Sequence, residues 1–343
     1  MSEFVTLSEI REAKDRIGGV AVRTPLYRVE RARLKMLELP EPEFDLYIKA
    51  ENEQPIGSFK LRGAYNMVSQ LSPEARSRGV ITYSSGNHAQ GVAYAAREVG
   101  SKAVIVMPSN APEVKKVATK ALGAEIVEVG PASSERRLKA EELVAEYGYN
   151  MIPPYDALQI IAGQATCGLE IVEQLPDVDL VLSPVSGGGL LSGVASAVKL
   201  AAEAGLASPN VKVWGVEPEL AADARESFYS KKLVEWPAEK TVRTIGDGLR
   251  TQSMGVLNFE HVLRYVDGIV TVSEEEIFAA MRAILMATKL VAEPSGAVTL
   301  AAALFHAREL PPARKVVVIL SGGNLEPALR ERLEAEMTPS HDA

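Results

Sequence analysis

The sequence predicts an α/β fold with two open, twisted sheets of mainly parallel strands, each flanked by helices. Short apolar runs alternate with helical patterns along most of the chain, which is the order of βαβ units in a parallel sheet. The alternation occurs in two stretches, about 80–147 and about 159–320. No linker rich in Pro, Gly or Ser separates them, so we expect two domains that share a wide interface and a cleft.

The individual elements follow from periodicity and from turn residues. A helix is expected over 6–17, a strand over 46–50, and a helix over 59–70 after the turn at Gly57-Ser58. The first stretch predicts strands over 80–83, 103–107 and 125–129, and helices over 87–99, 113–122 and 134–147. The second predicts strands over 180–185, 211–216, 269–272 and 315–320, and helices over 159–174, 190–204, 274–291 and 295–305.

Composition narrows the class of protein. Of the 343 residues 47% are hydrophobic and 24% are charged, the balance of an ordinary globular protein. The net charge is -8 and no basic patch is present, which argues against a nucleic-acid or anionic-membrane partner. No apolar run approaches the ~18 residues of a membrane span, and the N-terminus lacks the apolar core of a signal peptide. We therefore expect a cytoplasmic protein. The single cysteine, Cys167, excludes an intramolecular disulfide and is interpreted as a core residue.

Lys60 is the first candidate for chemistry. It lies in the first turn of a predicted helix, after Gly57 and the capping residue Ser58. The positive end of a helix lowers the pKa of a lysine ammonium and frees the amine, as a Schiff-base lysine requires. Taken alone, the segment is more typical of a surface lysine that follows a helix cap.

Ser186-Gly187-Gly188-Gly189-Leu190 joins an apolar strand to a helix. Three glycines allow backbone N–H groups to converge on an anion, and the helix N-terminus adds a favourable potential. The segment has neither the GxGxxG nor the GK[ST] pattern, which favours a simple phosphate over a nucleotide. The alternative is a tight turn with close packing.

Two further polar segments follow predicted strands, Ser84-Ser85-Gly86-Asn87-His88 and Ser321-Gly322-Gly323-Asn324. Open α/β sheets bind ligands at the carboxyl ends of their strands. Each segment alone is more typical of a capping turn than of a ligand site.

Together these motifs are much more specific. The chain resembles the fold-type II pyridoxal-phosphate enzymes of the tryptophan synthase beta-like fold, in particular the threonine dehydratase and serine racemase branch. The resemblance covers about residues 6–327. It implies a large cofactor-binding domain made of 1–76 and 157–343, a small mobile substrate-loop domain over 77–156, and a homodimer. The motifs that carry it are those above and the segments Glu51-Asn52, Leu61-Arg62-Gly63-Ala64, Ile161-Ala162-Gly163-Gln164, Gly246-Asp247-Gly248 and Glu293-Pro294-Ser295-Gly296-Ala297.

The resemblance implies a role for each cofactor residue. Lys60 would form the Schiff base and remove the Cα proton, and Phe59 would lie against the pyridine ring. Asn87 would hydrogen-bond the phenolic oxygen of the ring, and Ser321 would face the pyridine nitrogen. The remaining implied cofactor ligands are Ser186, Gly187, Gly188, Gly189 and Leu190 at the phosphate, with Glu293 and Gly322 nearby.

The resemblance also implies the substrate loop, in which Ser84, Ser85, Gly86, Asn87 and His88 would hold the substrate carboxylate. Ser85 would act on the face of the substrate opposite Lys60. A histidine at the start of a helix is more typical of packing beneath the loop than of a general base, and we interpret His88 in this way.

The implied reaction is dehydration and deamination of a small 3-hydroxy amino acid, L-threonine or L-serine, to a 2-oxo acid and ammonia. A serine such as Ser321 cannot keep the pyridine nitrogen protonated as an aspartate would, which favours loss of a β-substituent over transamination. Tyr155, at a position often aromatic in the dehydratases, favours the same reaction. The alternatives are a serine racemase, a 3-hydroxyaspartate dehydratase, a β-replacement synthase, a threonine synthase (which would carry aspartate where this chain has Leu61) and a non-catalytic binding protein.

The resemblance finally implies a divalent cation. Glu217 and Asp223 would supply carboxylates and Ala221 its carbonyl oxygen, and hard oxygen ligands suit Mg²⁺ or Ca²⁺. The alternative is an exposed acidic turn.

Overall fold

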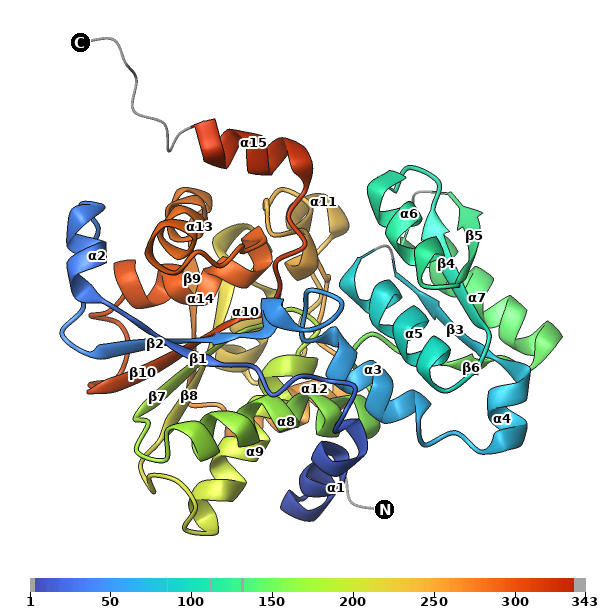
Figure 1. The fold of residues 1–343 in the computed structure, drawn as a ribbon, viewed down its shortest axis with the longest axis horizontal. Helices are drawn as coiled ribbons and strands as arrows, with labels where there is room; N and C mark the ends of the chain where they lie inside the picture. Colours follow the sequence, from blue (N-terminus) through green and yellow to red (C-terminus); the bar gives the residue numbers. More distant parts are fainter. Residues whose placement is uncertain (1–3, 85, 112, 131–132, 336–343) are drawn as a thin grey trace.

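The computed structural model describes residues 4–84, 86–111, 113–130 and 133–335. Within these residues it contains two sheets with helices on both faces (Figure 1). The larger sheet has the strand order β1-β2-β10-β7-β8-β9, and the smaller sheet the order β5-β4-β3-β6. The two-sheet α/β fold predicted from the sequence is therefore confirmed.

The larger sheet is parallel except at one edge, where β1 pairs with β2 in antiparallel fashion. This edge strand is not predicted from the sequence, because only the last of its four residues, Val29, is buried and no apolar run marks it. The strands are β1 (Leu26–Val29), β2 (Asp45–Ala50), β7 (Leu180–Pro184), β8 (Lys212–Pro218), β9 (Gly268–Val272) and β10 (Lys315–Leu320).

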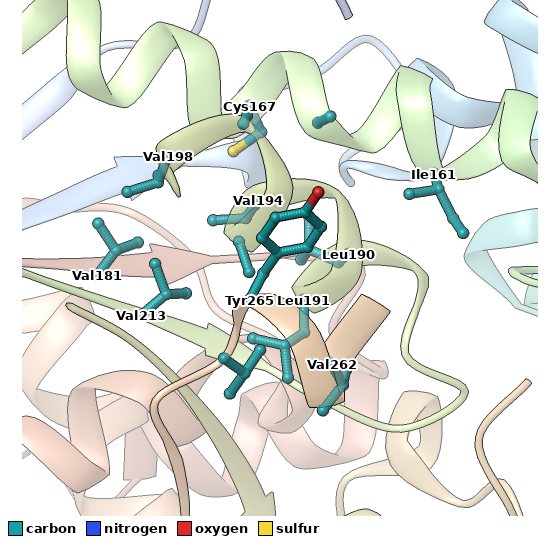
Figure 2. Close-up of a cluster of buried hydrophobic side chains, with 14 of the residues drawn as sticks. Ile161, Cys167, Val181, Leu190, Leu191, Val194, Val198, Val213, Val262 and Tyr265 are labelled. Atoms are coloured by element: carbon teal, nitrogen blue, oxygen red, sulfur yellow. The ribbon is translucent and has the colours of Figure 1, made fainter. Parts of the chain in front are cut away.

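Alternation along the strands builds a separate core on each face of this sheet. In β10, Val317 and Ile319 join the core beneath α1 (Leu7–Ile17), α8 (Leu158–Gln174), α9 (Gly189–Glu203) and α12 (Val256–Tyr265). Val316 and Val318 join the opposite core, beneath α2 (Arg31–Met36), α13 (Glu274–Thr288) and α14 (Pro294–Phe305). Figure 2 shows part of the first core, with Cys167 among its aliphatic side chains.

The smaller sheet is parallel throughout. It comprises β3 (Val80–Tyr83), β4 (Ala103–Pro108), β5 (Glu125–Val129) and β6 (Asn150–Met151), with α5 (Asn87–Glu98) and α7 (Ser133–Tyr147) on opposite faces. Helix α3 (Lys60–Val68) packs on both α5 and α8, so it lies between the two halves of the molecule (Figure 1).

The remaining helices are short and are not predicted from the sequence. They are α4 (Pro73–Arg78), α10 (Asp223–Ser230), α11 (Ala238–Thr241) and α15 (Pro327–Ala335), together with η1 (Glu51–Glu53), η2 (Glu219–Ala221) and η3 (Asp247–Leu249). Helix α6 (Glu113–Ala121), in contrast, is predicted over 113–122. In the described part of the chain, no helix combines the length and apolar character needed to cross a bilayer.

Candidate active site

The motifs meet because the strands before them are neighbours. Strand β10 lies between β2 and β7, and all three run parallel. The segments that follow them are 51–60 after β2, 321–324 after β10 and 185–189 after β7. The carboxyl ends of parallel strands share one edge of a sheet, so the lysine, serine and glycine motifs lie at the same edge.

Backbone hydrogen bonds join the lysine motif to the serine motif. The Phe59 N–H donates to the Ser321 carbonyl at 3.0 Å, and the Gly323 N–H donates to the Gly57 carbonyl at 2.9 Å. Ser58 and Gly322 form an antiparallel bridge between these bonds. The position of Lys60 relative to Ser321 is therefore fixed by the backbone itself.

Lys60 begins α3 and is half-buried. Its Nζ donates to the Pro154 carbonyl at 2.7 Å and lies 5.2 Å from the centre of the Phe59 ring. Burial lowers the pKa of Lys60 to about 8, because the charged ammonium loses hydration. The neutral fraction near neutral pH is then larger than for an exposed lysine, as a nucleophilic amine requires.

A buried ion cluster fixes the helix that carries Lys60. Arg62, fully buried, donates to both carboxylate oxygens of Glu51, at 2.7 and 2.8 Å. It also donates to both oxygens of Glu170 in α8, at 2.7 and 2.9 Å. Lys49 donates to Glu170 at 2.6 Å and to the Thr24 carbonyl at 2.7 Å. The fixed geometry of these bidentate pairs holds α3 in one orientation.

Asn87 is held by two side chains from outside the smaller sheet, Glu293 at the N-cap of α14 and Asn324 after β10. Its Nδ2 donates to Glu293 Oε1 at 2.7 Å, and its Oδ1 accepts from Asn324 Nδ2 at 2.7 Å. The Glu293 N–H in turn donates to the Gly322 carbonyl at 3.1 Å. Burial raises the pKa of Glu293 to about 8, and the negative charge of Asp247 adds to this rise. The network joins α5, the serine motif and the start of α14.

The glycine motif forms a cradle of N–H groups at the start of α9. Gly188 is the N-cap of the helix at φ 95°, a left-handed conformation that favours glycine. Among the described residues, none accepts a hydrogen bond from the N–H of Gly187, Gly188, Gly189 or Leu190. These buried donors at a helix N-terminus are suited to a phosphate group.

Side chains close on this cradle from two sides. A Cβ atom added at Gly187 would lie only 2.6 Å from Cγ of the Tyr155 ring, so the ring packs directly on the loop. A Cβ atom added at Gly188 would lie 2.7 Å from the Cβ of Asn258. The Ser186 hydroxyl is 2.6 Å from that of Thr251. Burial raises the pKa of Tyr155 to about 12, so its hydroxyl stays neutral.

The expected substrate loop follows β3. The Ser84 hydroxyl accepts from the Gly86 N–H at 3.3 Å, and Gly86 is the N-cap of α5. Ser85 lies outside the described residues. His88 is buried with its Nε2 3.0 Å from the Ile152 carbonyl, and burial together with nearby Lys60 lowers its pKa to about 3. His88 is therefore a buried residue that contacts the backbone next to β6, and its role in supporting the substrate loop stays a prediction.

Comparison with known proteins gives the identity of this arrangement. A family model described as pyridoxal-phosphate dependent enzyme matches residues 19–322. The chain belongs to this family. Its residues fit the cofactor: the open N–H cradle suits a phosphate, and Lys60 offers an amine of lowered pKa. The family resemblance seen in the sequence is confirmed.

Individual relatives of this pyridoxal-phosphate enzyme cover nearly its whole length. It is 40% identical over 323 residues to the L-threo-3-hydroxyaspartate ammonia-lyase of Saccharomyces cerevisiae, with 94% of each chain covered. It is 39% identical over 329 residues to the catabolic L-threonine dehydratase of Staphylococcus aureus, covering 95% of this chain and 90% of that relative. The crystal structure of serine racemase from Dictyostelium discoideum superposes with a TM-score of 0.84 at 36% identity, covering 95% of this chain and 100% of that one.

The acidic pair of the enzyme lies on either side of η2, with Glu217 near the end of β8 and Asp223 at the start of α10. Glu217 Oε1 and Oε2 accept from the N–H groups of Ala224 and Arg225, at 3.1 and 2.8 Å, so Glu217 caps α10. Both carboxylate oxygens of Asp223 are buried without a hydrogen-bond partner among the described residues. Burial raises the pKa of Glu217 well above its usual value and that of Asp223 to about 7. The described chain has no cluster of three His, Cys, Asp or Glu side chains suited to a metal ion.

Three residues of the site carry no assigned role in the sequence analysis. Asn324 ends the serine motif and Asp247 stands between two glycines, so each belongs to a recognised motif. Thr251, which bonds Ser186, follows no motif and has no signal in the sequence.

Proposed function

We propose that this enzyme removes water from a small 3-hydroxy amino acid, L-threonine or L-serine. Hydrolysis of the released enamine then takes up one water molecule, frees ammonia and leaves the 2-oxo acid. The observation that carries the proposal is the residue at the end of β10, where Ser321 rather than a carboxylate lies beside the lysine motif. A serine hydroxyl does not keep a pyridine nitrogen protonated, which favours β-elimination. Relatives named as an ammonia-lyase and a dehydratase support the same reaction.

Different residues would bind different parts of the cofactor. Gly187, Gly188, Gly189 and Leu190 would donate their free N–H groups to the cofactor phosphate, with Ser186 beside them. Phe59 and Asn87 would hold the ring, and Ser321 and Gly322 would line its nitrogen side. When bound, pyridoxal phosphate supplies an electron sink for the charge that develops at the substrate Cα.

Lys60 moves the proton in this proposal. Its Nζ would hold the cofactor covalently and, as a free amine, accept the proton from Cα. The lowered pKa of about 8 places the amine near the range in which it can both accept and return a proton at neutral pH. Glu293, protonated at neutral pH because its pKa is raised to about 8, would hold the Asn87 amide without placing a negative charge there.

The loop from Ser84 to His88 would hold the substrate carboxylate through N–H and hydroxyl donors at the start of α5. His88 would support this loop through the Ile152 carbonyl and stay neutral. Ser85 would face the substrate from the side opposite Lys60.

The experiment is a substrate panel for the holoenzyme. L-threonine, L-serine, D-serine and both 3-hydroxyaspartate diastereomers are incubated with the enzyme, and 2-oxo acid and the enantiomers of the remaining substrate are measured. We expect 2-oxo acid from L-threonine or L-serine and none with Lys60→Ala. Interconversion of enantiomers faster than oxo-acid release would replace the proposal by a racemase. If only 3-hydroxyaspartate gave oxo acid, the reaction would stand but its substrate would be 3-hydroxyaspartate instead of L-threonine or L-serine.

We also propose a divalent cation, Mg²⁺ or Ca²⁺, held by Asp223, Glu217 and the Ala221 carbonyl oxygen. The two buried carboxylate oxygens of Asp223 that lack partners support it, because buried carboxylates are normally hydrogen-bonded or bound to metal. Either cation should raise the melting temperature of the native protein, and a chelator should lower it. An equal shift in Asp223→Asn would rule out this site.

We further propose that the enzyme is a homodimer that works on its small amino-acid substrate in the cytoplasm, as the family resemblance implies. Light scattering on the purified protein tests the dimer, and a monomeric mass at micromolar concentration would contradict it.

A further inference from the structure

The cradle is enclosed by two segments that lie far apart in the sequence. Tyr155, from the connection after β6, packs on Gly187. The start of α12 packs on the other side: Asn258 lies against Gly188, and the Gly255 N–H donates to the Gly187 carbonyl at 3.0 Å. The Asn258 carbonyl also accepts from the Ser192 hydroxyl of α9 at 3.1 Å. The shape of the cradle therefore depends on how these two segments are held together.

One side chain joins them. Asp156 directly follows Tyr155, and its Oδ2 and Oδ1 accept from the N–H groups of Val256 and Leu257, at 3.1 and 3.0 Å. Its Oδ1 also accepts from Asn258 Nδ2 at 3.3 Å. The N-cap of α12 is Gly255, which has no side chain to cap the helix, so a residue about a hundred positions earlier does so.

Because Gly255 has no side chain, it leaves room for the Asp156 side chain to reach α12. A Cβ atom added there would lie 2.6 Å from the Cβ of Asp156. The far end of α12 is fixed independently, because Val262 and Tyr265 pack with Leu191 and Val194 of α9 in the buried core (Figure 2). With that end anchored, the contact to Asp156 sets the position of the first turn of α12 against the glycines.

We infer that Asp156 is a positioning residue for the cofactor phosphate, acting through α12 and Tyr155 on the cradle of Gly187 to Leu190. The inference rests on the proposed function, since it concerns the phosphate of the same cofactor. The carboxylate oxygens of Asp156 themselves accept hydrogen bonds from backbone N–H groups of α12. This capping satisfies the positive end of α12 and leaves the N-terminus of α9 as the anion site.

The test compares two lost helix caps. Asp156→Ala removes the cap of α12, and Ser273→Ala removes the cap of α13, where Ser273 Oγ accepts from the Glu276 N–H at 3.3 Å on the other face of the sheet. Each apoprotein is titrated with pyridoxal phosphate to obtain its dissociation constant, and its melting temperature is measured. The ³¹P resonance of the bound cofactor is recorded as well.

Both variants should lower the melting temperature, but only Asp156→Ala should weaken pyridoxal-phosphate binding, by about tenfold, and shift the ³¹P resonance. Asp156→Asn, which keeps one oxygen acceptor and the shape of the side chain, should bind between native and Asp156→Ala, and it serves as the readout if the alanine variant does not fold. Native affinity and an unshifted resonance in a folded Asp156 variant would overturn the inference. A native protein that binds no pyridoxal phosphate would instead overturn the proposed function.

Discussion

Burial shifts the pKa values of two titratable groups at the site, Lys60 and Glu293, in opposite directions. The pKa of Lys60 falls to about 8 and that of Glu293 rises to about 8, in both cases first because the charged form loses hydration. Each group therefore has an accessible neutral form at neutral pH. A neutral Glu293 can hold Asn87 while adding no charge beside the cofactor, and a neutral Lys60 can act as a base.

Glu293 gives a prediction for the stability of the apoprotein. Its folded pKa of about 8 lies above the ordinary value of 4.5, so its protonation stabilises the fold fully below about pH 4.5, and this contribution is lost as the pH rises through 8. Glu293→Gln should remove this loss, which amounts to a few kcal/mol, and flatten the profile of unfolding free energy between pH 5 and 8.5. Urea unfolding at several pH values measures the free energy of unfolding of both proteins across this range.

The control for this measurement is Glu275→Gln, which changes an exposed carboxylate on α13. It should leave the slope with pH as in the native protein. A Glu293→Gln profile as steep as the native one would contradict the assignment of Glu293 as the titrating group.

At the scale of elements, the orientation of α3 decides where Lys60 lies. The helix has neighbours on both sides, α5 and α8, and its buried Arg62 is bonded to carboxylates that come from η1 and α8. Apolar packing alone allows a helix to slide or rotate, whereas bidentate bonds to two fixed carboxylates do not. The cluster thus links the lysine motif to the core of the larger sheet.

Arg62→Met should therefore destabilise the protein strongly. It would leave the buried carboxylates of Glu51 and Glu170 without their main partner, a loss of about 3–5 kcal/mol. Denaturant unfolding gives the change in free energy. Arg28→Met is the matched control, because the Arg28 and Asp45 pair, at 2.9 Å, is exposed and screened by solvent. Equal losses of unfolding free energy in the two variants would show that the buried cluster stabilises the protein no more than an exposed ion pair does.

At the scale of the whole molecule, sequence reasoning succeeded where the signal is local. The apolar run Leu180–Pro184, with three glycines at 187–189 shortly after it, predicts both the strand and the turn, because both depend on residues close in sequence. It failed for β1, a short half-exposed edge strand, and for α12, whose cap Asp156 lies about a hundred residues away. The contacts of Asn87 with Glu293 and Asn324 join residues more than 200 positions apart. Such contacts are set by tertiary packing and leave no pattern in a single sequence.

One ion cluster joins the two halves of the molecule at the rim of the site. Lys115 of α6, which packs beside the smaller sheet, lies 2.6 Å from Asp247 in η3 and 3.2 Å from Glu326 before α15. Asp247 and Glu326 also line a cavity of about 110 Å³ together with Glu293 and Asn324. Lys115 is largely buried, so this pair is less screened than an exposed one.

Reversing this charge should separate the two halves locally. Lys115→Glu places a third carboxylate beside Asp247 and Glu326, and the repulsion should raise the hydrogen-exchange rate of α6 and β5 severalfold while the larger sheet stays protected. The double variant Lys115→Glu/Asp247→Lys should restore slow exchange, because it rebuilds the pair with opposite polarity. Lys120→Glu, on the exposed face of the same helix, controls for the change in net charge. If Lys115→Glu and Lys120→Glu exchange alike, the ion cluster does not hold α6 against the larger half.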